Sequence, residues 1–387
     1  MKTIVIKLGT SSICDELSFI PKLSNLSSLI ETVVHLNTKK FNIIIVSSGA
    51  VAVGLKTLNL KKRPKQLQKL QAVAAVGQGR LMALYDTLFS QFNLPIAQIL
   101  LSRDNVSDRI PYLNAKNTLK ELLTMNVVPI INENDSVSTN ELRFGDNDSL
   151  SAIVAGMVHA DFLFLLTDVD GLYTDNPRLN PLATPIKVVH DIQALREQVN
   201  VQSSGSSVGT GGMVTKLIAA ELSTAAGCSM IITRGSVPTR IIDILNHIEE
   251  FPDVLELPFG TRFVAASTPM DNKLWWIRHS IATSGSLTID AGAYKAITRK
   301  QRGSLFAAGI TTVTGTFNAN QSVIIQTVLN NTLTEIARGI VSYSAVEINL
   351  IKGLKSRDIK DVLGYVECDY VIHRDHLAID AAFSNES

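Results

Sequence analysis

Two lysines lie in segments whose composition suits phosphate binding. Lys7 ends the apolar run Ile4-Val-Ile6 and is followed by Leu-Gly-Thr-Ser, where glycine lets the backbone approach a ligand. Lys216 ends the segment Gly209-Thr-Gly-Gly-Met-Val-Thr-Lys216. This segment is not a Walker A loop, because Thr215 rather than glycine precedes the lysine. Since a lysine on a buried strand is costly unless it is paired, the two lysines predict a cationic clamp for a phosphoryl group.

Three further loops are rich in hydroxyl, amide and carboxyl groups: Ser47–Ala50, Asn132–Asp148 and Thr167–Asp168. Acidic and amide oxygens accept hydrogen bonds from an ammonium, whereas amide N–H groups and arginine donate to carboxylates. The loop from Asn132 to Asp148 therefore suits a zwitterionic amino acid. The alternatives are a tight turn at residues 47–50, a helix cap at Asn147 or Asp148, and a flexible glycine linker at 209–216.

The chemistry that these residues predict is phosphoryl transfer. In that reaction a protein mainly positions the reactants and stabilises charge, with Mg²⁺ accompanying the nucleotide. A carboxylate acceptor is already ionised at neutral pH and needs no general base, which agrees with the lack of histidine in these loops. No side chain is assigned as a metal ligand.

Short apolar runs alternate with helical patterns through the first 260 residues or so. The runs at 3–6, 43–46, 127–131, 162–166 and 229–232 predict strands buried on both faces. Between and beyond them, apolar positions recur at helical spacing over 67–89, 114–125, 150–158 and 216–226. This order predicts an α/β fold with an open, mostly parallel sheet between helices, whose ligands lie beyond the carboxyl ends of the strands.

A change in amino-acid composition and pattern near residue 258 indicates two domains. Turn-forming residues follow it, and after about residue 275 the runs are short, strand-like and separated by glycine. We predict a catalytic domain at 1–258, a linker at 259–274 and a small β-rich domain at 275–387.

Composition excludes several classes of protein. With 45% hydrophobic and 18% charged residues the chain is ordinary globular material, and a net charge of +1 gives no footprint for nucleic acid or an anionic membrane. The three cysteines are far apart and lack metal-ligand spacing, so neither a disulfide framework nor a zinc site is expected. Lys7 interrupts the first apolar run too early for a secretory signal, and no run is long enough to span a membrane. A cytoplasmic location is expected.

The motifs occur together in the order and spacing of one family, and the chain resembles the glutamate 5-kinase family almost end to end. The pieces that carry the resemblance are Val5–Thr10, Ser48–Ala50, Leu113–Ala115, Asn132–Asp135, Gly145–Asp148, Leu166–Asp168, Gly171–Tyr173, and Thr210–Met213 with Thr215–Lys216. The resemblance implies the amino-acid kinase fold followed by a PUA-like domain. It also implies ATP-dependent phosphorylation of the L-glutamate γ-carboxylate, the first step of proline biosynthesis, with feedback inhibition by proline.

The resemblance assigns roles to individual residues. Lys7 and Lys216 would be catalytic, and Asp148 would hold them in position, a role that we infer and that no motif carries. The ATP-binding residues would be Lys7, Gly9, Thr10, Thr167, Asp168, Tyr173, Thr210, Gly211, Gly212, Met213 and Lys216. The substrate-binding residues would be Ser48, Gly49, Ala50, Asn132, Asn134, Asp135, Asp146 and Asn147. Arg143 departs from the lysine expected there, which leaves substrate affinity or proline sensitivity open to change.

The second domain resembles a PUA domain at Leu287–Ala293, Gly309–Ile310 and Ala337–Ile340. Basic and acidic residues are nearly balanced there, so RNA binding is not expected. The expected partners are ATP, L-glutamate and proline, a further copy of the chain in a dimer or tetramer, and a glutamyl-phosphate reductase. Three alternative hypotheses remain. The first is a kinase of the same fold that acts on aspartate, N-acetylglutamate, carbamate or UMP. The second is an RNA-binding or RNA-modifying protein, and the third is a catalytically silent amino-acid sensor.

Overall fold

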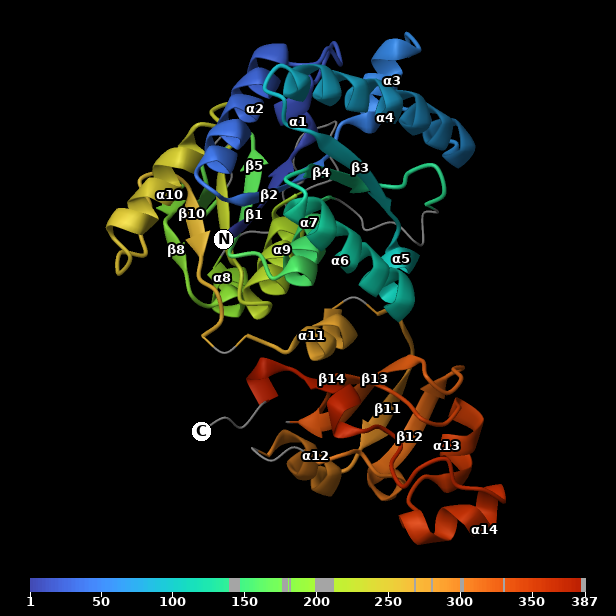
Figure 1. The fold of residues 1–387 in the computed structure, drawn as a ribbon. Coiled ribbons are helices and arrows are strands. Elements are labelled where there is room, and N and C mark those ends of the chain that lie inside the picture. Colours follow the sequence, from blue (N-terminus) through green and yellow to red (C-terminus); the bar gives the residue numbers. More distant parts are fainter. Residues whose placement is uncertain are drawn as a thin grey trace. The chain divides into compact units, whose positions relative to one another are not determined.

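The computed structural model describes residues 1–138, 147–175, 180, 182–198, 212–267, 269–279, 281–299, 303–329 and 331–383. Contacts divide the chain into two compact units, Met1–Pro269 and Met270–Ser387. Each unit has a sheet of its own (Figure 1).

The described part of the first unit contains an eight-stranded sheet and a two-stranded ribbon. The sheet strands are β1 (Thr3–Leu8), β2 (Asn42–Ser47), β3 (Ile96–Leu101), β4 (Val128–Glu133), β5 (Phe162–Thr167), β8 (Val188–Val189), β9 (Ser229–Arg234) and β10 (Thr261–Phe263). Their order is β3-β4-β2-β1-β5-β9-β10-β8, and all neighbours run parallel except β9 and β10. The ribbon pairs β6 (Leu172–Tyr173) with β7 (Pro185–Ile186). The predicted mostly parallel sheet is confirmed.

Helices cover both faces of this sheet (Figure 1). They are α1 (Thr10–Ile13), α2 (Leu23–Thr38), α3 (Ala50–Thr57), α4 (Leu67–Ser90), α5 (Arg103–Ser107), α6 (Arg109–Thr124), α7 (Asn147–Val158), α8 (Ile192–Gln198), α9 (Met213–Ala225) and α10 (Arg240–Glu250). One face packs against α2, α4 and α10, and the other contacts α6, α7 and α9. The strands are therefore buried on both sides, as their continuous apolar runs predict.

The alternation of β1 decides which way its lysine points. Ile4, Ile6 and Leu8 belong to the core shared with α2 and α10. Successive side chains of a strand point to opposite faces, so Lys7 lies on the other side, where β1 contacts α7. The single lysine of the strand is therefore directed at a helix whose residues are almost all buried.

Two strands and one helix boundary differ from the sequence-based expectation. Strand β3 is an edge strand with a glutamine and mostly half-buried residues, so it lacks the apolar run of a central strand. Strand β10 lies within residues 259–274, where a linker was expected, and pairs with β9. Helix α6 begins at Arg109 rather than near residue 114, because Pro111 is tolerated in the first turn of a helix.

The described part of the second unit is a five-stranded sheet with short helices. The strand order is β12-β11-β13-β14-β15, with β11 and β13 parallel and the other pairs antiparallel. The strands are β11 (Thr283–Ile289), β12 (Ile310–Gly315), β13 (Ser322–Leu329), β14 (Thr332–Ile340) and β15 (Leu377–Ile379). The helices are α11 (Asn272–His279), α12 (Ala291–Thr298), α13 (Ala345–Ile351) and α14 (Ile359–Leu363). The predicted β-rich character is confirmed.

Cys14, Cys228 and Cys368 all carry free thiols, and burial raises the pKa of the Cys14 thiol to about 12. No helix within the described ranges is both long enough and apolar enough to cross a membrane.

Helices α3 and α4 pack so closely that glycine is required at their contact. A Cβ atom added to Gly77 of α4 would lie 1.7 Å from the carbonyl oxygen of Ala50, and one added to Gly54 of α3 would lie 2.0 Å from that of Val73. Gly79, on the same helix, has no atom within 4 Å of such a Cβ. Close packing at Gly77 thus fixes the start of α3, which follows the loop at Ser48.

We expect Gly77→Ala to lower the free energy of unfolding by about 2 kcal/mol or more, because backbone atoms must move to admit the methyl group. Gly79→Ala is the matched control and should be neutral or stabilising by up to about 1 kcal/mol. Urea denaturation of both variants measures the difference. Equal stabilities would show that the two helices separate at little cost.

Candidate active site

The carboxyl ends of five neighbouring parallel strands lie together along one end of the sheet, which we call its carboxyl edge. In spatial order these are β4, β2, β1, β5 and β9, and all run in the same direction. Side chains that the sequence singled out stand at four of these ends: Asn132 on β4, Ser48 after β2, Lys7 on β1 and Thr167 on β5. The edge predicted for ligand binding is thus the edge where the polar residues gather.

A buried carboxylate joins the two lysines at this edge. The Lys7 ammonium lies 2.5 Å from Oδ1 of Asp148, and the Lys216 ammonium lies 3.2 Å from Oδ2. The hydroxyl of Thr215 also donates to Oδ2, at 3.1 Å. Asp148 is fully buried and the lysine side chains are only 9% and 12% exposed, so the three charges form one desolvated cluster.

Two helix N-termini contribute to this cluster. Asp148 is in the first turn of α7, where the helix dipole favours negative charge. Lys216 is in the first turn of α9, which begins at Met213, directly after Gly212. Burial by itself raises the pKa of Asp148, but the charges and hydrogen bonds of the two lysines outweigh it and hold the pKa well below its ordinary value. Asp148 is therefore ionised, and two ammonium groups share one carboxylate.

A second polar cluster surrounds Asn147, the first residue of α7. Its Nδ2 atom lies within 3.0 Å of three acceptors: the carbonyl oxygen of Ser47, the hydroxyl of Ser48 and Oδ1 of Asn132. The ends of β2 and β4 are thereby joined to the helix that carries Asp148. Gly49 follows in the left-handed conformation, with φ of 93°, and precedes Ala50 at the start of α3.

Two supporting side chains were not found from the sequence. Gln78 accepts from Asn132 Nδ2 at 2.7 Å, and the Tyr85 hydroxyl lies 2.9 Å from the hydroxyl of Ser47. Burial raises the pKa of Tyr85, so this hydroxyl stays protonated. Both residues lie on α4. The apolar spacing of this helix predicts only a face that packs against the sheet, and no local motif indicates a role for either residue.

Residues expected to bind nucleotide lie at the ends of β1 and β5. The Gly9 amide donates to the Leu166 carbonyl, and Thr10 opens the short helix α1. The Thr167 hydroxyl donates to Asp168 at 3.1 Å. Thr167 and Asp168 also line a cavity of about 770 Å³, together with Ser11, Ser12 and residues at the start of α2.

The remaining expected residues lie in the turn after β4, in the two-stranded ribbon or outside the described residues. Asn134 and Asp135 lie in the turn after β4, where Asn134 Oδ1 accepts from Ser136 at 2.5 Å. Tyr173 lies in the ribbon, opposite Pro185. Asp146, Thr210, Gly211 and the variant position Arg143 lie outside the described residues.

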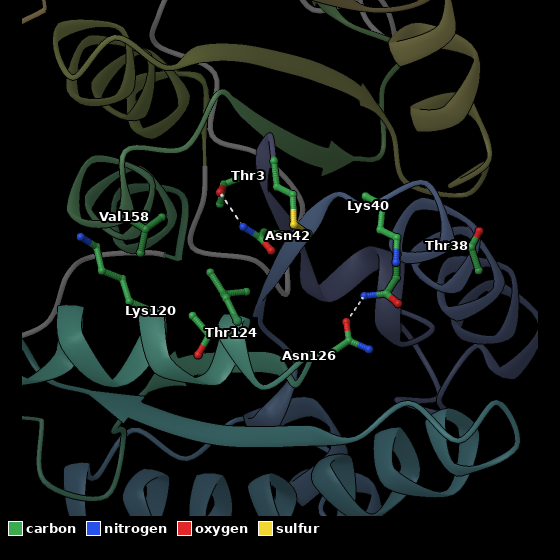
Figure 2. A pocket seen from close by; sticks show the side chains of 11 residues that line it. Thr3, Thr38, Lys40, Asn42, Lys120, Thr124, Asn126 and Val158 are labelled. Atoms are coloured by element: carbon green, nitrogen blue, oxygen red, sulfur yellow. Dashed lines mark hydrogen bonds between the residues drawn. The ribbon is translucent and has the colours of Figure 1, made fainter.

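A larger cavity, of about 960 Å³, lies at the amino ends of the strands, opposite the carboxyl edge (Figure 2). Thr3 and Asn42, the first residues of β1 and β2, line it, and so do Lys40, Lys120 and Asn126 near the ends of α2 and α6. None of the described lining residues is a carboxylate. It is thus separate from the cluster around Asp148.

Replacing Asp148 with asparagine should leave two buried ammonium groups without a counterion. We expect Asp148→Asn to cost about 3–5 kcal/mol of unfolding free energy at pH 7. Because the folded pKa is depressed, this stabilisation is present above the unfolded value of about 3.9 and is lost progressively as the pH falls from there toward the folded pKa. The gap between variant and wild type in urea denaturation should therefore narrow on acidification.

The control for this prediction is Asp86→Asn, which changes an exposed carboxylate on α4 and should stay within about 0.5 kcal/mol of wild type. A gap between Asp148→Asn and wild type that stays constant between pH 7 and pH 2 would contradict the assigned ion pairs.

Comparison with known proteins agrees with this arrangement. Residues 2–234 match the model of the amino acid kinase family, and residues 285–363 match that of the PUA domain. The probable glutamate 5-kinase of Schizosaccharomyces pombe is 53% identical over 380 residues, which cover 97% of this chain and 93% of the relative. The glutamate 5-kinase of Rippkaea orientalis is 45% identical over 379 residues, which cover 98% and 99% of the two chains.

Among solved structures, the carbamate kinase from Giardia lamblia bound to AMP-PNP matches with 18% identity and a TM-score of 0.49, over 68% of this chain and 99% of that one. The family model covers more than half of this chain, and the two relatives are matched along almost their whole length. This chain is therefore a kinase that belongs to the amino acid kinase family, in the group of the glutamate 5-kinases, and it carries a PUA domain.

Proposed function

We propose that this kinase transfers the γ-phosphoryl group of ATP to the side-chain carboxylate of L-glutamate and so forms L-glutamyl 5-phosphate. The observation that carries the proposal is the buried cluster of Lys7, Asp148 and Lys216. Two ammonium groups converge there on one carboxylate, at the edge of the sheet where polar loops gather. The surplus positive charge in a desolvated place complements a phosphoryl group in transfer.

In the proposed reaction a carboxylate oxygen of glutamate forms a bond to the γ-phosphorus while the bond from that phosphorus to the bridging oxygen of ADP breaks. The acceptor is already ionised, so no proton has to be removed. Lys7 and Lys216 stabilise the charge on the moving phosphoryl group, and Asp148 orients both ammonium groups. The work of the protein is positioning and electrostatic stabilisation.

Mg²⁺ belongs to this proposal as the partner of ATP. Both oxygens of Asp148 are engaged by lysines, so this carboxylate is not offered to a metal. No group of three or more His, Cys, Asp or Glu side chains suited to a metal occurs within the described ranges. In nucleotide-dependent enzymes Mg²⁺ is commonly held by the phosphates of the nucleotide and by several waters, and we assign it to ATP on that ground. Bound there, Mg²⁺ neutralises phosphate charge.

Glutamate is assigned to the cluster around Asn147 and to the loops that meet there. Ser48, Asn132 and Asn147 offer hydroxyl and amide groups beside the charged cluster, Asp135 lies in the turn after β4, and Asp146 directly precedes Asn147 in the sequence. ATP is assigned to the turns after β1 and β5 and to the segment that leads into α9. These assignments follow the motifs, and the convergence of their elements at one edge supports them.

The family resemblance carries the finer parts of the proposal. These are a place at the first step of proline biosynthesis, feedback inhibition by proline, a cytoplasmic location, assembly as a homodimer or homotetramer, and delivery of the labile acyl phosphate to a glutamyl-phosphate reductase.

The decisive experiment measures ADP release from purified protein with Mg-ATP and a panel of acceptors: L-glutamate, L-aspartate, N-acetyl-L-glutamate, carbamate and UMP. We expect turnover with L-glutamate, suppressed by added L-proline. Turnover with another acceptor alone would overturn the substrate assignment and keep the kinase chemistry. Turnover with glutamate that proline leaves unchanged would remove only the proposed regulation.

Substitution of the two lysines tests the roles within the site. Lys7→Ala and Lys216→Ala should each lower kcat about 10²- to 10³-fold, because a group that stabilises transferring charge is lost, and should change KM for glutamate far less. Lys2→Ala is the matched control, since Lys2 directly precedes the same strand at its other end and is about half exposed. An unchanged kcat in Lys216→Ala would remove that residue from the mechanism.

A further inference from the structure

A second ion cluster holds the turn that follows β5. This turn runs from Asp168 to Gly171 and directly follows Thr167, so Asp168 lies in it and Thr167 precedes it, and both are among the residues that we assign to ATP. In its middle, Asp170 accepts hydrogen bonds from Nε and Nη2 of Arg234, at 2.7 and 2.6 Å. Nη1 of Arg240 donates to the same carboxylate at 2.6 Å. A planar fork on both carboxylate oxygens fixes orientation as well as distance.

The two arginines come from different elements. Arg234 is the last residue of β9 and lies in register with Thr167 across the parallel pair of strands. Arg240 is the first residue of α10, and its guanidinium lies over the ring of Phe259, 4.5 Å from the centroid. The carboxylate therefore accepts hydrogen bonds from one strand and one helix, and a cation–π contact with the ring of Phe259 further orients Arg240.

Backbone hydrogen bonds hold both ends of the same turn. At its start, the Gly235 amide donates to the Thr167 carbonyl at 2.7 Å. At its end, the Leu172 amide donates to the hydroxyl of the buried Thr261 at 2.7 Å. Gly171 lies so close to Thr261 that a Cβ would meet that hydroxyl at 2.8 Å. Without Asp170, the middle of the turn would lose its side-chain hold between these two ends.

Both arginines donate hydrogen bonds to this carboxylate, which indicates that they act on the nucleotide site through Asp170. Arg234 uses Nε and Nη2 on Asp170, and Arg240 uses Nη1. The hydrogen bonds from Arg234, with those from Arg240, lower the pKa of Asp170 to about 2, so the carboxylate stays charged at neutral pH. Ion pairs this exposed contribute little to stability. Geometric constraint on the turn is therefore the effect that the pair can supply.

We propose that Arg234 and Arg240 are positioning residues for the nucleotide: through Asp170 they hold the turn after β5 so that Thr167 and Asp168 face ATP. The proposal rests on the assignment of that turn to ATP. It adds residues that the motifs of the sequence do not indicate, because Arg234 and Arg240 lie far from Asp170 along the chain.

The test measures binding of Mg-AMP-PNP by calorimetry and steady-state kinetics with Mg-ATP and L-glutamate. Asp170→Ala and Arg234→Ala should each raise Kd for AMP-PNP and KM for ATP about tenfold, with kcat within about twofold and KM for glutamate unchanged. Arg234→Lys keeps the charge but loses the fork, and should weaken binding nearly as much. A Kd for Arg234→Lys equal to that of wild type would overturn the proposal.

The double variant separates positioning from direct contact. If Arg234 acts through Asp170, the variant carrying both Asp170→Ala and Arg234→Ala should bind AMP-PNP no more weakly than either single variant. Multiplied effects would mean that Arg234 touches the nucleotide itself, and would overturn the proposal. Arg357→Ala is the control, since it removes an exposed arginine paired with a neighbouring aspartate in the second unit, and should leave both constants unchanged.

Two further readouts keep the proposal distinct from stability and from the proposed function. Each variant's Tm is measured, and if Arg234→Ala does not fold, Arg234→Lys and Asp170→Asn carry the test. Wild type is assayed with glutamate in parallel. Weakened AMP-PNP binding in Arg234→Lys without glutamate turnover in wild type would refute the function and keep the positioning role. Normal turnover with unchanged binding would refute the positioning role alone.

Discussion

Two ammonium groups on one buried carboxylate are the constraint on which the candidate site depends. Desolvation of Lys7, Asp148 and Lys216 offsets much of the energy of their attraction, so the cluster adds little net stability, although removing one partner is costly. It fixes the orientation of the two ammonium groups well, because each buried and paired side chain has few alternative conformations. The cluster keeps surplus positive charge at the carboxyl edge of the sheet, which is the property that an incoming phosphoryl group requires.

The surrounding fold can be understood from that cluster outward. Strand β1 alternates so that its lysine leaves the hydrophobic face and meets α7. Helix α7 is buried along almost its whole length, which holds Asp148 at a fixed depth. Asn147, one residue earlier, ties the same helix to the ends of β2 and β4. The charged cluster at Asp148 and the polar cluster at Asn147 are thus built on consecutive residues of one rigid element, where a small displacement of either would affect both.

The side chains that support this element come from regions with no functional signature. Helix α4 supplies Gln78 and Tyr85, and its Gly77 allows the close approach to α3 that places the loop at Ser48. On the other side of β1, Arg234 and Arg240 grip Asp170 in the turn after β5. In the strand order, these supporting contacts lie at β2 and β4 on one side of β1 and at β5 and β9 on the other, as expected where a site must be held in place by its surroundings.

The sequence by itself determined the class of fold, because continuous apolar runs separated by helical periodicity are compatible with a parallel sheet between helices. It also determined which loops carry chemistry, since Lys7, Thr167, Asn132 and Ser48 follow or end those runs. The edge strand β3 escaped detection, because a half-buried strand lacks a continuous apolar run. Strand β10 lay inside the expected linker, because its partner β9 is distant in the chain and pairing is not a local property.

Only the tertiary structure decided which of the polar residues meet. Asp148 was expected to hold both lysines, yet Lys7 and Lys216 are separated by most of the first unit, and only the strand order β2-β1-β5-β9 brings their elements to one helix. The contacts of Gln78, Tyr85, Arg234 and Arg240 have no local signal at all. The physical reason is that motifs record the backbone conformation and chemistry of a few consecutive residues, whereas desolvation and ion pairing depend on distances that exist only after the strands have paired.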